Sequence, residues 1–157
     1  MDPEAIRPAI ENADAVVSAL GPHGLAPTTV LSDAVRSILQ AMDKTGVRRL
    51  IVISANGAYP GDEDGPFTRL LLRPLLQRIL RNNFADTHRM DDEIRASSTD
   101  WTIMRPPQLT KGPRSGRYRT AIDRHIGRRI SRADLADAIL KAITDHVTVN
   151  HTLGIGY

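Results

Sequence analysis

Two short apolar segments joined by one amphipathic helix constrain the fold of this chain more than any other feature. The segments Asp14–Leu20 and Arg49–Ser54 are apolar on both faces, which is typical of strands buried inside a parallel sheet. Between them, apolar residues recur at helical spacing from Val30 to Met42, and Gly46 is placed to end the helix. Because parallel strands require such a crossover, the pattern predicts a βαβ unit and an α/β fold.

The rest of the chain continues the alternation of helices and strands. Asp2 before Pro3 is typical of a helix N-cap followed by proline at the first helical position. Ser131, with Asp134 three residues later, predicts the start of another helix. The further elements that we expect are a helix ending near residue 12, helices at 67–80, 86–97 and 132–144, strands at 101–105 and 151–155, and a hairpin-like stretch at 117–122. We predict one domain, residues 1–157, with a Rossmann-like parallel sheet and helices on both faces.

The composition excludes several kinds of site. The chain has no cysteine, so disulfides, thiolate metal sites and cysteine nucleophiles are excluded. Its five histidines are scattered, without an i, i+4 pair, so we assign no metal. Apolar runs stay far below the roughly 20 residues of a membrane span, and the acidic start at 1–4 lacks the basic residues of an export signal. We therefore expect a cytoplasmic protein with no membrane partner.

One region of the chain is strongly basic. From Lys111 to Arg132 there are eight basic residues and one acidic residue, Asp123, although the net charge of the whole chain is only +3. A solvated arginine-rich surface and a contact for nucleic acid are the two interpretations. Because Tyr118 is the one aromatic residue available there to stack on a base, we expect no nucleic-acid partner.

Small or rigid residues follow three of the predicted strands. They are Ala-Leu-Gly-Pro at 19–22, Ser-Ala-Asn-Gly at 54–57 and Arg-Pro-Pro-Gln at 105–108. In open parallel sheets, ligands bind beyond the carboxyl ends of the strands. Exposed backbone amides in these stretches suit the close approach of a flat cofactor, although Gly and Pro also end strands that bind nothing.

Six segments, in order along the chain, resemble the atypical short-chain dehydrogenases/reductases, the group that includes biliverdin IXβ and flavin reductases and the NmrA-like NAD(P)-binding proteins. The segments are DAVVSALG (14–21), LAPTTVLSDAVRSILQAM (25–42), GVRRLIVISA (46–55), Arg89-Met90, DWTIMRPPQLT (100–110) and RRISRADLADAIL (128–140). The resemblance implies a Rossmann-like sheet, NADP or NAD as cofactor, and hydride transfer to a flavin or a similar conjugated small molecule.

The resemblance begins only after the family's third strand. No glycine-rich turn of the kind that holds a cofactor diphosphate is present, so we expect the N-terminal βαβαβ portion to be absent. A misplaced start codon, a truncated chain and a naturally shortened paralogue are all open explanations. In the family's strand order, the segment 14–20 would then lose a neighbour, and its bare apolar edge predicts a homo-oligomer formed through that edge.

The resemblance also assigns roles to residues at the three strand ends. Ser54 matches a serine near the nicotinamide and the substrate and is the candidate catalytic residue; alternatively, it only bonds its own backbone. Pro106 and Pro107 resemble a diproline that lies against the nicotinamide, and Gln108 stands where biliverdin IXβ reductase has a histidine. The predicted cofactor-binding residues are Leu20, Gly21, Pro22, Thr28, Ser54, Ala55, Pro106, Pro107 and Gln108, and the predicted substrate-binding residues are Asn56 and Arg105.

Several candidates have a structural alternative. Thr28 and Thr29 can contact a phosphate or serve as N-caps of the long helix. Arg105 can pair with a substrate anion or with a carboxylate of the protein. We interpret the acidic run 91–93 as a solvated helix face. The leucine-rich stretch 69–81 resembles the family's lid segment, and lid or oligomer contact is our interpretation of it.

These features predict an NAD(P)H-dependent reductase that is impaired by loss of the diphosphate-binding turn. No tyrosine is followed four residues later by a lysine, so the proton donor of ordinary short-chain dehydrogenases is missing. The resemblance therefore implies that the protein orients cofactor and substrate while solvent supplies the proton. The alternative is a catalytically silent NmrA-like module that senses a nucleotide or binds a protein.

Overall fold

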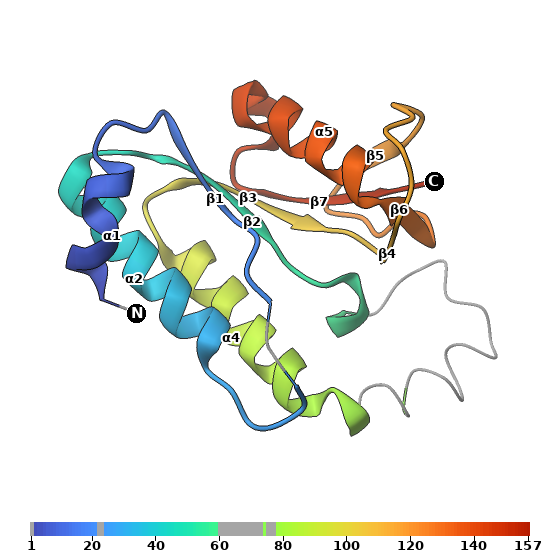
Figure 1. Ribbon diagram of the computed structural model, residues 1–157, viewed down its shortest axis with the longest axis horizontal. Coiled ribbons are helices and arrows are strands. Elements are labelled where there is room, and N and C mark those ends of the chain that lie inside the picture. The colour runs from blue at the N-terminus through green and yellow to red at the C-terminus, as the bar shows by residue number, and fades with distance from the viewer. Residues whose placement is uncertain (1, 22–23, 60–73, 75–77) are drawn as a thin grey trace.

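A five-stranded sheet forms the centre of the computed structural model, which describes residues 2–21, 24–59, 74 and 78–157 (Figure 1). The strand order is β1-β2-β3-β7-β5; the first four are parallel, and β5 is antiparallel to β7. A second, two-stranded parallel sheet pairs β4 with β6. The strands are β1 (Ala15–Ser18), β2 (Arg49–Ile53), β3 (Asp100–Arg105), β4 (Gln108–Thr110), β5 (Arg119–Ile122), β6 (Arg129–Ser131) and β7 (His151–Gly156). The predicted Rossmann-like parallel sheet is confirmed.

Helices cover both faces of this sheet (Figure 1). The helices α1 (Pro3–Ile10), α2 (Val30–Thr45) and α4 (Arg81–Ala96) lie on one face, and α5 (Arg132–Thr144) lies on the other. Side chains alternate along β2, so Leu50 and Val52 pack with α2 and α4, whereas Ile51 packs with α5. Burial of each such side chain contributes about 1.5–3 kcal/mol, which is why the strands are apolar on both faces.

Helix caps lie where the sequence predicts them. The Asp2 carboxylate accepts a hydrogen bond from the amide of Glu4, and the Ser131 hydroxyl accepts one from the amide of Asp134. Gly46 ends α2 in the left-handed conformation, with φ of 76°, and its amide donates to the carbonyl of Met42. A residue with a Cβ would be strained at that φ, so the glycine fixes the end of the crossover helix.

The first turn of α2 differs from the prediction. Val30 is 51% exposed, because the buried stripe starts one residue later, at Leu31. The predicted helix at 86–97 begins earlier, at Arg81, and the first helix ends at Ile10 rather than near residue 12. The predicted helix 67–80 and the stretch 69–81 lie for the most part outside the described residues.

The hairpin predicted at 117–122 is wrong. The segment forms β5, which pairs with the distant strand β7. Close backbone approach makes this pairing possible, since a Cβ added at Gly154 would lie 1.9 Å from the carbonyl oxygen of Arg124. The local pattern of 117–122 indicates a strand, but its partner, β7, lies about 30 residues further along the chain, beyond the reach of a local pattern.

The buried side chain of Arg49, in β2, connects the sheet to α5. Its guanidinium is buried and donates to the carbonyls of Ala142 and Ile143, in the last turn of α5, and to the hydroxyls of Thr102 and Thr148. A cation at this end of a helix complements the helix dipole. Burial lowers the pKa of Arg49, although an arginine remains charged at neutral pH.

The sheet has one edge at β1. Within the described residues, β1 pairs only with β2, and Val17 and Leu20 are 42% and 41% exposed. No helix in the described part of the chain has both the length and the apolarity needed to cross a bilayer.

Candidate functional site

The carboxyl ends of β2 and β3 bring two of the predicted site residues together. Ile53 pairs with Met104 in the parallel register, and the amide of Ser54 donates to the carbonyl of Met104 across 2.8 Å. Ser54, which follows β2, therefore lies beside Arg105, the last residue of β3. Both are buried, with exposed fractions of 8% and 7%.

A carboxylate from α4 joins these strand ends. The Oδ2 atom of Asp91 accepts from Arg105 Nη2 at 2.7 Å, from the Tyr59 hydroxyl at 2.7 Å and from the Ser54 hydroxyl at 3.3 Å. Asp91 is almost completely buried, so the prediction that 91–93 forms a solvated face is wrong for this residue. The reason is that α4 turns Met90, Asp91 and Ile94 toward the protein and leaves Asp92 in solvent. Arg105 makes the internal ion pair that was one of its two predicted roles.

Tyr59 closes the cluster on its other side. The Arg105 guanidinium carbon lies 3.3 Å from the centre of the tyrosine ring, and the edge of His88 contacts the same ring, with centroids 4.5 Å apart. Burial raises the pKa of Tyr59, and the hydrogen bond to Asp91 raises it further. The phenol therefore keeps its proton at neutral pH and directs it toward Asp91.

Tyr59 and Asp91 are the site residues that our sequence analysis missed. One signal was available: an arginine at the end of a buried strand requires a carboxylate, and Asp91 lies on the helix that leads into that strand. Nothing comparable singles out Tyr59, which reaches Asp91 only through the fold.

Two polar atoms of the cluster keep unused capacity for hydrogen bonds. Asp91 Oδ1 and Arg105 Nε are buried and have no hydrogen-bond partner among the described residues. One is an acceptor and the other a donor, and leaving such groups unpaired is costly.

The other predicted site residues are spread along the same edge of the sheet. Leu20 and Gly21 are exposed just after β1, and Ala55 is half-buried after β2. Pro106 is buried, Pro107 is half-buried, and Gln108 is exposed at the start of β4. Pro22 and the side chain of Asn56 lie outside what the structure describes.

The N-terminus of α2 already holds an anion of the protein itself. The buried carboxylate of Asp86 accepts from the amide of Leu31 at 2.8 Å and from the amide and hydroxyl of Ser32 at 3.3 and 2.6 Å. The hydroxyl of Thr28 accepts from the amide of Val30, as an N-terminal cap would. The amides of Leu31 and Ser32 are therefore not available to a phosphate, and the contact of Thr28 with a cofactor stays a prediction.

Pro106 and Pro107 offer a rigid surface beside the strand-end cluster, which suits the flat ring of a nicotinamide. The unpaired atoms of the cluster, Asp91 Oδ1 and Arg105 Nε, are buried away from solvent, so we do not assign them to a ligand. For the diphosphate, the amides of Leu31 and Ser32 at the start of α2 are occupied by Asp86, and the sequence contains no glycine-rich turn. The parts of the chain that the structure describes contain no group of three or more His, Asp or Glu side chains able to hold a metal ion.

Comparison with known proteins shows the family of this chain. Residues 1–146 match the model of the NAD(P)H-binding family, so the chain belongs to that family. This membership confirms the predicted NAD(P)-binding assignment, with NADP or NAD as the cofactor of the family.

Solved structures share the fold. A short-chain dehydrogenase/reductase from Veillonella parvula in complex with NADP is 20% identical, with a TM-score of 0.78 over 100% of this chain and 69% of that one. The oxidoreductase ylbE from Lactococcus lactis is 19% identical, with a TM-score of 0.78 over 99% and 67%. A Rossmann-fold NAD(P)-binding family protein from Shigella flexneri is 22% identical, with a TM-score of 0.67 over 98% and 64%. This chain therefore spans about two thirds of the length of these structures.

Proposed function

We propose that this chain is the reductase-like part of an NAD(P)H-dependent oxidoreductase whose substrate is a flavin or a similar conjugated small molecule. The observation that carries the proposal is the cluster of Ser54, Tyr59, Asp91 and Arg105 at the carboxyl ends of β2 and β3. In an open parallel sheet this is where ligands bind, and membership of the NAD(P)H-binding family supplies the cofactor class.

NAD(P)H, when bound, supplies the hydride. The chain's own residues supply orientation. Asp91 accepts the hydroxyl protons of Ser54 and Tyr59, which leaves the oxygen lone pairs of both hydroxyls to accept N–H groups from a ligand. Tyr59, with its raised pKa, does not release a proton near neutral pH, so water is the proposed proton source.

Substrate contacts are proposed at Asn56 and Arg105. For Arg105, burial and the ion pair of Nη2 with Asp91 leave little of the guanidinium for this contact. When the 157-residue chain is tested by itself, we expect weak NAD(P)H binding, because Asp86 occupies the amides of Leu31 and Ser32 at the start of α2 and the sequence has no glycine-rich turn for the diphosphate.

NADPH titration tests this proposal directly. Trp101, the single tryptophan, lies in β3 four residues before Arg105, so energy transfer from its indole to the reduced nicotinamide reports binding. We expect saturation at about millimolar NADPH, and FMN-dependent oxidation of NADPH followed at the nicotinamide absorbance. Absence of both signals would overturn the proposal.

A pair of serine variants isolates the strand-end cluster. Ser54→Ala should lower the rate of NADPH oxidation about tenfold, the value of one lost hydrogen bond. Ser98→Ala, an exposed serine before β3, is the matched control and should leave the rate unchanged. Binding of NADPH without oxidation of it by any flavin would favour the alternative, a nucleotide-sensing module.

We also propose that the chain forms a homo-oligomer through β1. The supporting observation is the partner-free side of this strand within the described residues, next to the exposed Val17. Val17→Lys should shift sedimentation at micromolar concentration toward the monomer, whereas Ile122→Lys, on the opposite edge strand, should not. A monomeric parent protein would contradict this proposal.

A further inference from the structure

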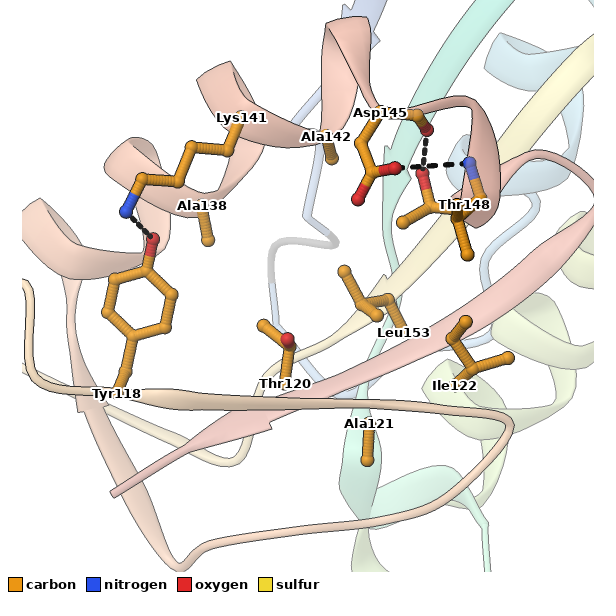
Figure 2. A pocket seen from close by; sticks show the side chains of 11 residues that line it. Tyr118, Thr120, Ala121, Ile122, Ala138, Lys141, Ala142, Asp145, Thr148 and Leu153 are labelled. Carbon is orange, nitrogen blue, oxygen red and sulfur yellow. Dashed lines mark hydrogen bonds between the residues drawn. The ribbon is translucent and has the colours of Figure 1, made fainter.

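A cavity of about 530 Å³ lies between α5 and the β5–β7 pair (Figure 2). It shares no lining residue with the strand-end cluster, and it lies on the face of the sheet opposite α4. The cavity exists because α5 presents Ala138 and Ala142 above Leu153, and two small side chains one turn apart leave the space unfilled. Its volume is within the range of small-molecule sites.

The two ends of the cavity are chemically different. Tyr118 and Lys141 form one end, and Asp145 and Thr148 form the other (Figure 2). Between them the hydroxyl of Thr120 points into the cavity, and no described residue bonds to it. The surface between the ends is apolar, with Leu153 at its centre and Ile122 at its rim.

Two cations share one carboxylate, Asp137, at the Tyr118 end. Asp137 pairs with both Arg114 and Lys141 and accepts the Tyr118 hydroxyl at 2.6 Å. Hydrogen bonds from Lys141 and Tyr118 lower the pKa of Asp137 to about 2, so this carboxylate is charged at neutral pH and still balances only one of the two cations. The Lys141 ammonium donates to Asp137 at 2.8 Å and to Tyr118 at 3.0 Å, which leaves its third proton for another acceptor.

The loop that carries Tyr118 is held in place from α5. The buried carboxylate of Asp134 accepts from the amides of Ser115 and Gly116, each at 2.8 Å, and from the hydroxyl of Tyr157. Burial raises the pKa of Asp134, but these hydrogen bonds more than offset that effect and hold it well below its ordinary range. The Tyr118 end of the cavity is therefore fixed before any ligand arrives.

We propose that this cavity binds a small apolar monocarboxylate, with its carboxylate on Lys141 and Thr120 and its hydrocarbon body over Leu153. The remaining proton of the Lys141 ammonium makes a charge-assisted hydrogen bond to the carboxylate, and the Thr120 hydroxyl donates a second hydrogen bond to it. Asp145 at the opposite end repels a second negative charge, so dicarboxylates and nucleotides are poor ligands.

Titration with 2-naphthoate tests the proposal, with neutral 2-naphthamide as a probe of the same body. Methyl NMR signals of Ala138 and Leu153 should shift with either probe, and naphthoate should bind about tenfold more tightly because its hydrogen bond to Lys141 is charge-assisted. Equal affinities, or shifts confined to residues outside the cavity, would overturn the proposal.

Three variants test separately whether probe binding needs the charge of Lys141 and the open space of the cavity. Lys141→Met should weaken naphthoate binding about tenfold and leave naphthamide unchanged, whereas Lys44→Met, on α2 at the opposite face, should change neither. Thr120→Phe fills the cavity from an exposed position and should abolish binding of both probes. Retained binding in Thr120→Phe, with an unchanged circular dichroism spectrum, would contradict the site.

Discussion

Two clusters in this molecule use the same three groups, a tyrosine hydroxyl, a carboxylate and a cation, in opposite surroundings. In the strand-end cluster, Tyr59 and Arg105 share Asp91, and the carboxylate and the arginine are buried. Beside α5, Tyr118 and Lys141 share Asp137; this carboxylate is also buried, but the side chain of its cation, Lys141, is 64% exposed.

The difference shows what burial does to a charged network. Inside the protein, Arg105 is packed against the Tyr59 ring and pairs with the buried Asp91, so its side chain is held in place. At the surface, Lys141 lies against water and keeps a proton and part of its charge for a ligand. A tyrosine, a carboxylate and a cation thus hold the ends of β2 and β3 together at Asp91, whereas at Asp137 the same three groups can form a binding surface.

Removal of the buried carboxylate should have the largest effect. Asp91→Ala leaves Arg105 as an unpaired buried cation, and we expect a loss of about 3–5 kcal/mol in the free energy of unfolding, measured with urea. Asp92→Ala, the exposed neighbour on α4, is the matched control and should change the stability by less than about 0.5 kcal/mol. Similar losses in both variants would mean that Asp91 is not the centre of a buried network.

The two tyrosines sharpen the comparison. Tyr59→Phe removes a hydrogen bond to a buried carboxylate and should cost about 1.5–3 kcal/mol, whereas Tyr118→Phe should cost less than about 1 kcal/mol because water can replace the lost partner. Urea unfolding of both variants measures the two losses in the free energy of unfolding. A larger loss for Tyr118→Phe than for Tyr59→Phe would contradict the proposed difference between the two clusters.

Acid should destabilise the cluster of Tyr118, Asp137 and Lys141 in a defined pH window. The folded-state pKa of Asp137 is about 2, below its ordinary value of 3.8, so its stabilising contribution is complete above pH 3.8 and is lost as the pH falls through about 2. In Asp137→Asn, the urea midpoint should be lower at neutral pH and should fall less between those two pH values. An unchanged pH profile would show that Lys141 and Tyr118 do not stabilise the carboxylate.

Lys141→Met should have the smallest effect on stability. The ammonium is exposed and Arg114 remains to pair with Asp137, so the urea midpoint should stay unchanged within error. A clear loss of stability would place Lys141 among the structural residues instead of the ligand-facing ones.

The candidate site was only partly predictable. The end of each parallel strand follows from local sequence, so Ser54 and Arg105 could be placed at the same edge of the sheet. The partner of Arg105 could not be placed, because the acidic run on α4 contains one buried and one exposed aspartate in succession. Only the rotation of the helix against the sheet distinguishes Asp91 from Asp92.

By itself, the sequence determined the alternation of strands and helices, the caps at Asp2, Gly46 and Ser131, and the α/β class, because these depend on residue spacing within a few turns of chain. The tertiary structure decided that β5 pairs with β7, that Asp91 collects three donors, and that a cavity opens beside α5. These features depend on residues far apart in sequence, whose contacts are fixed only when helices and strands pack together.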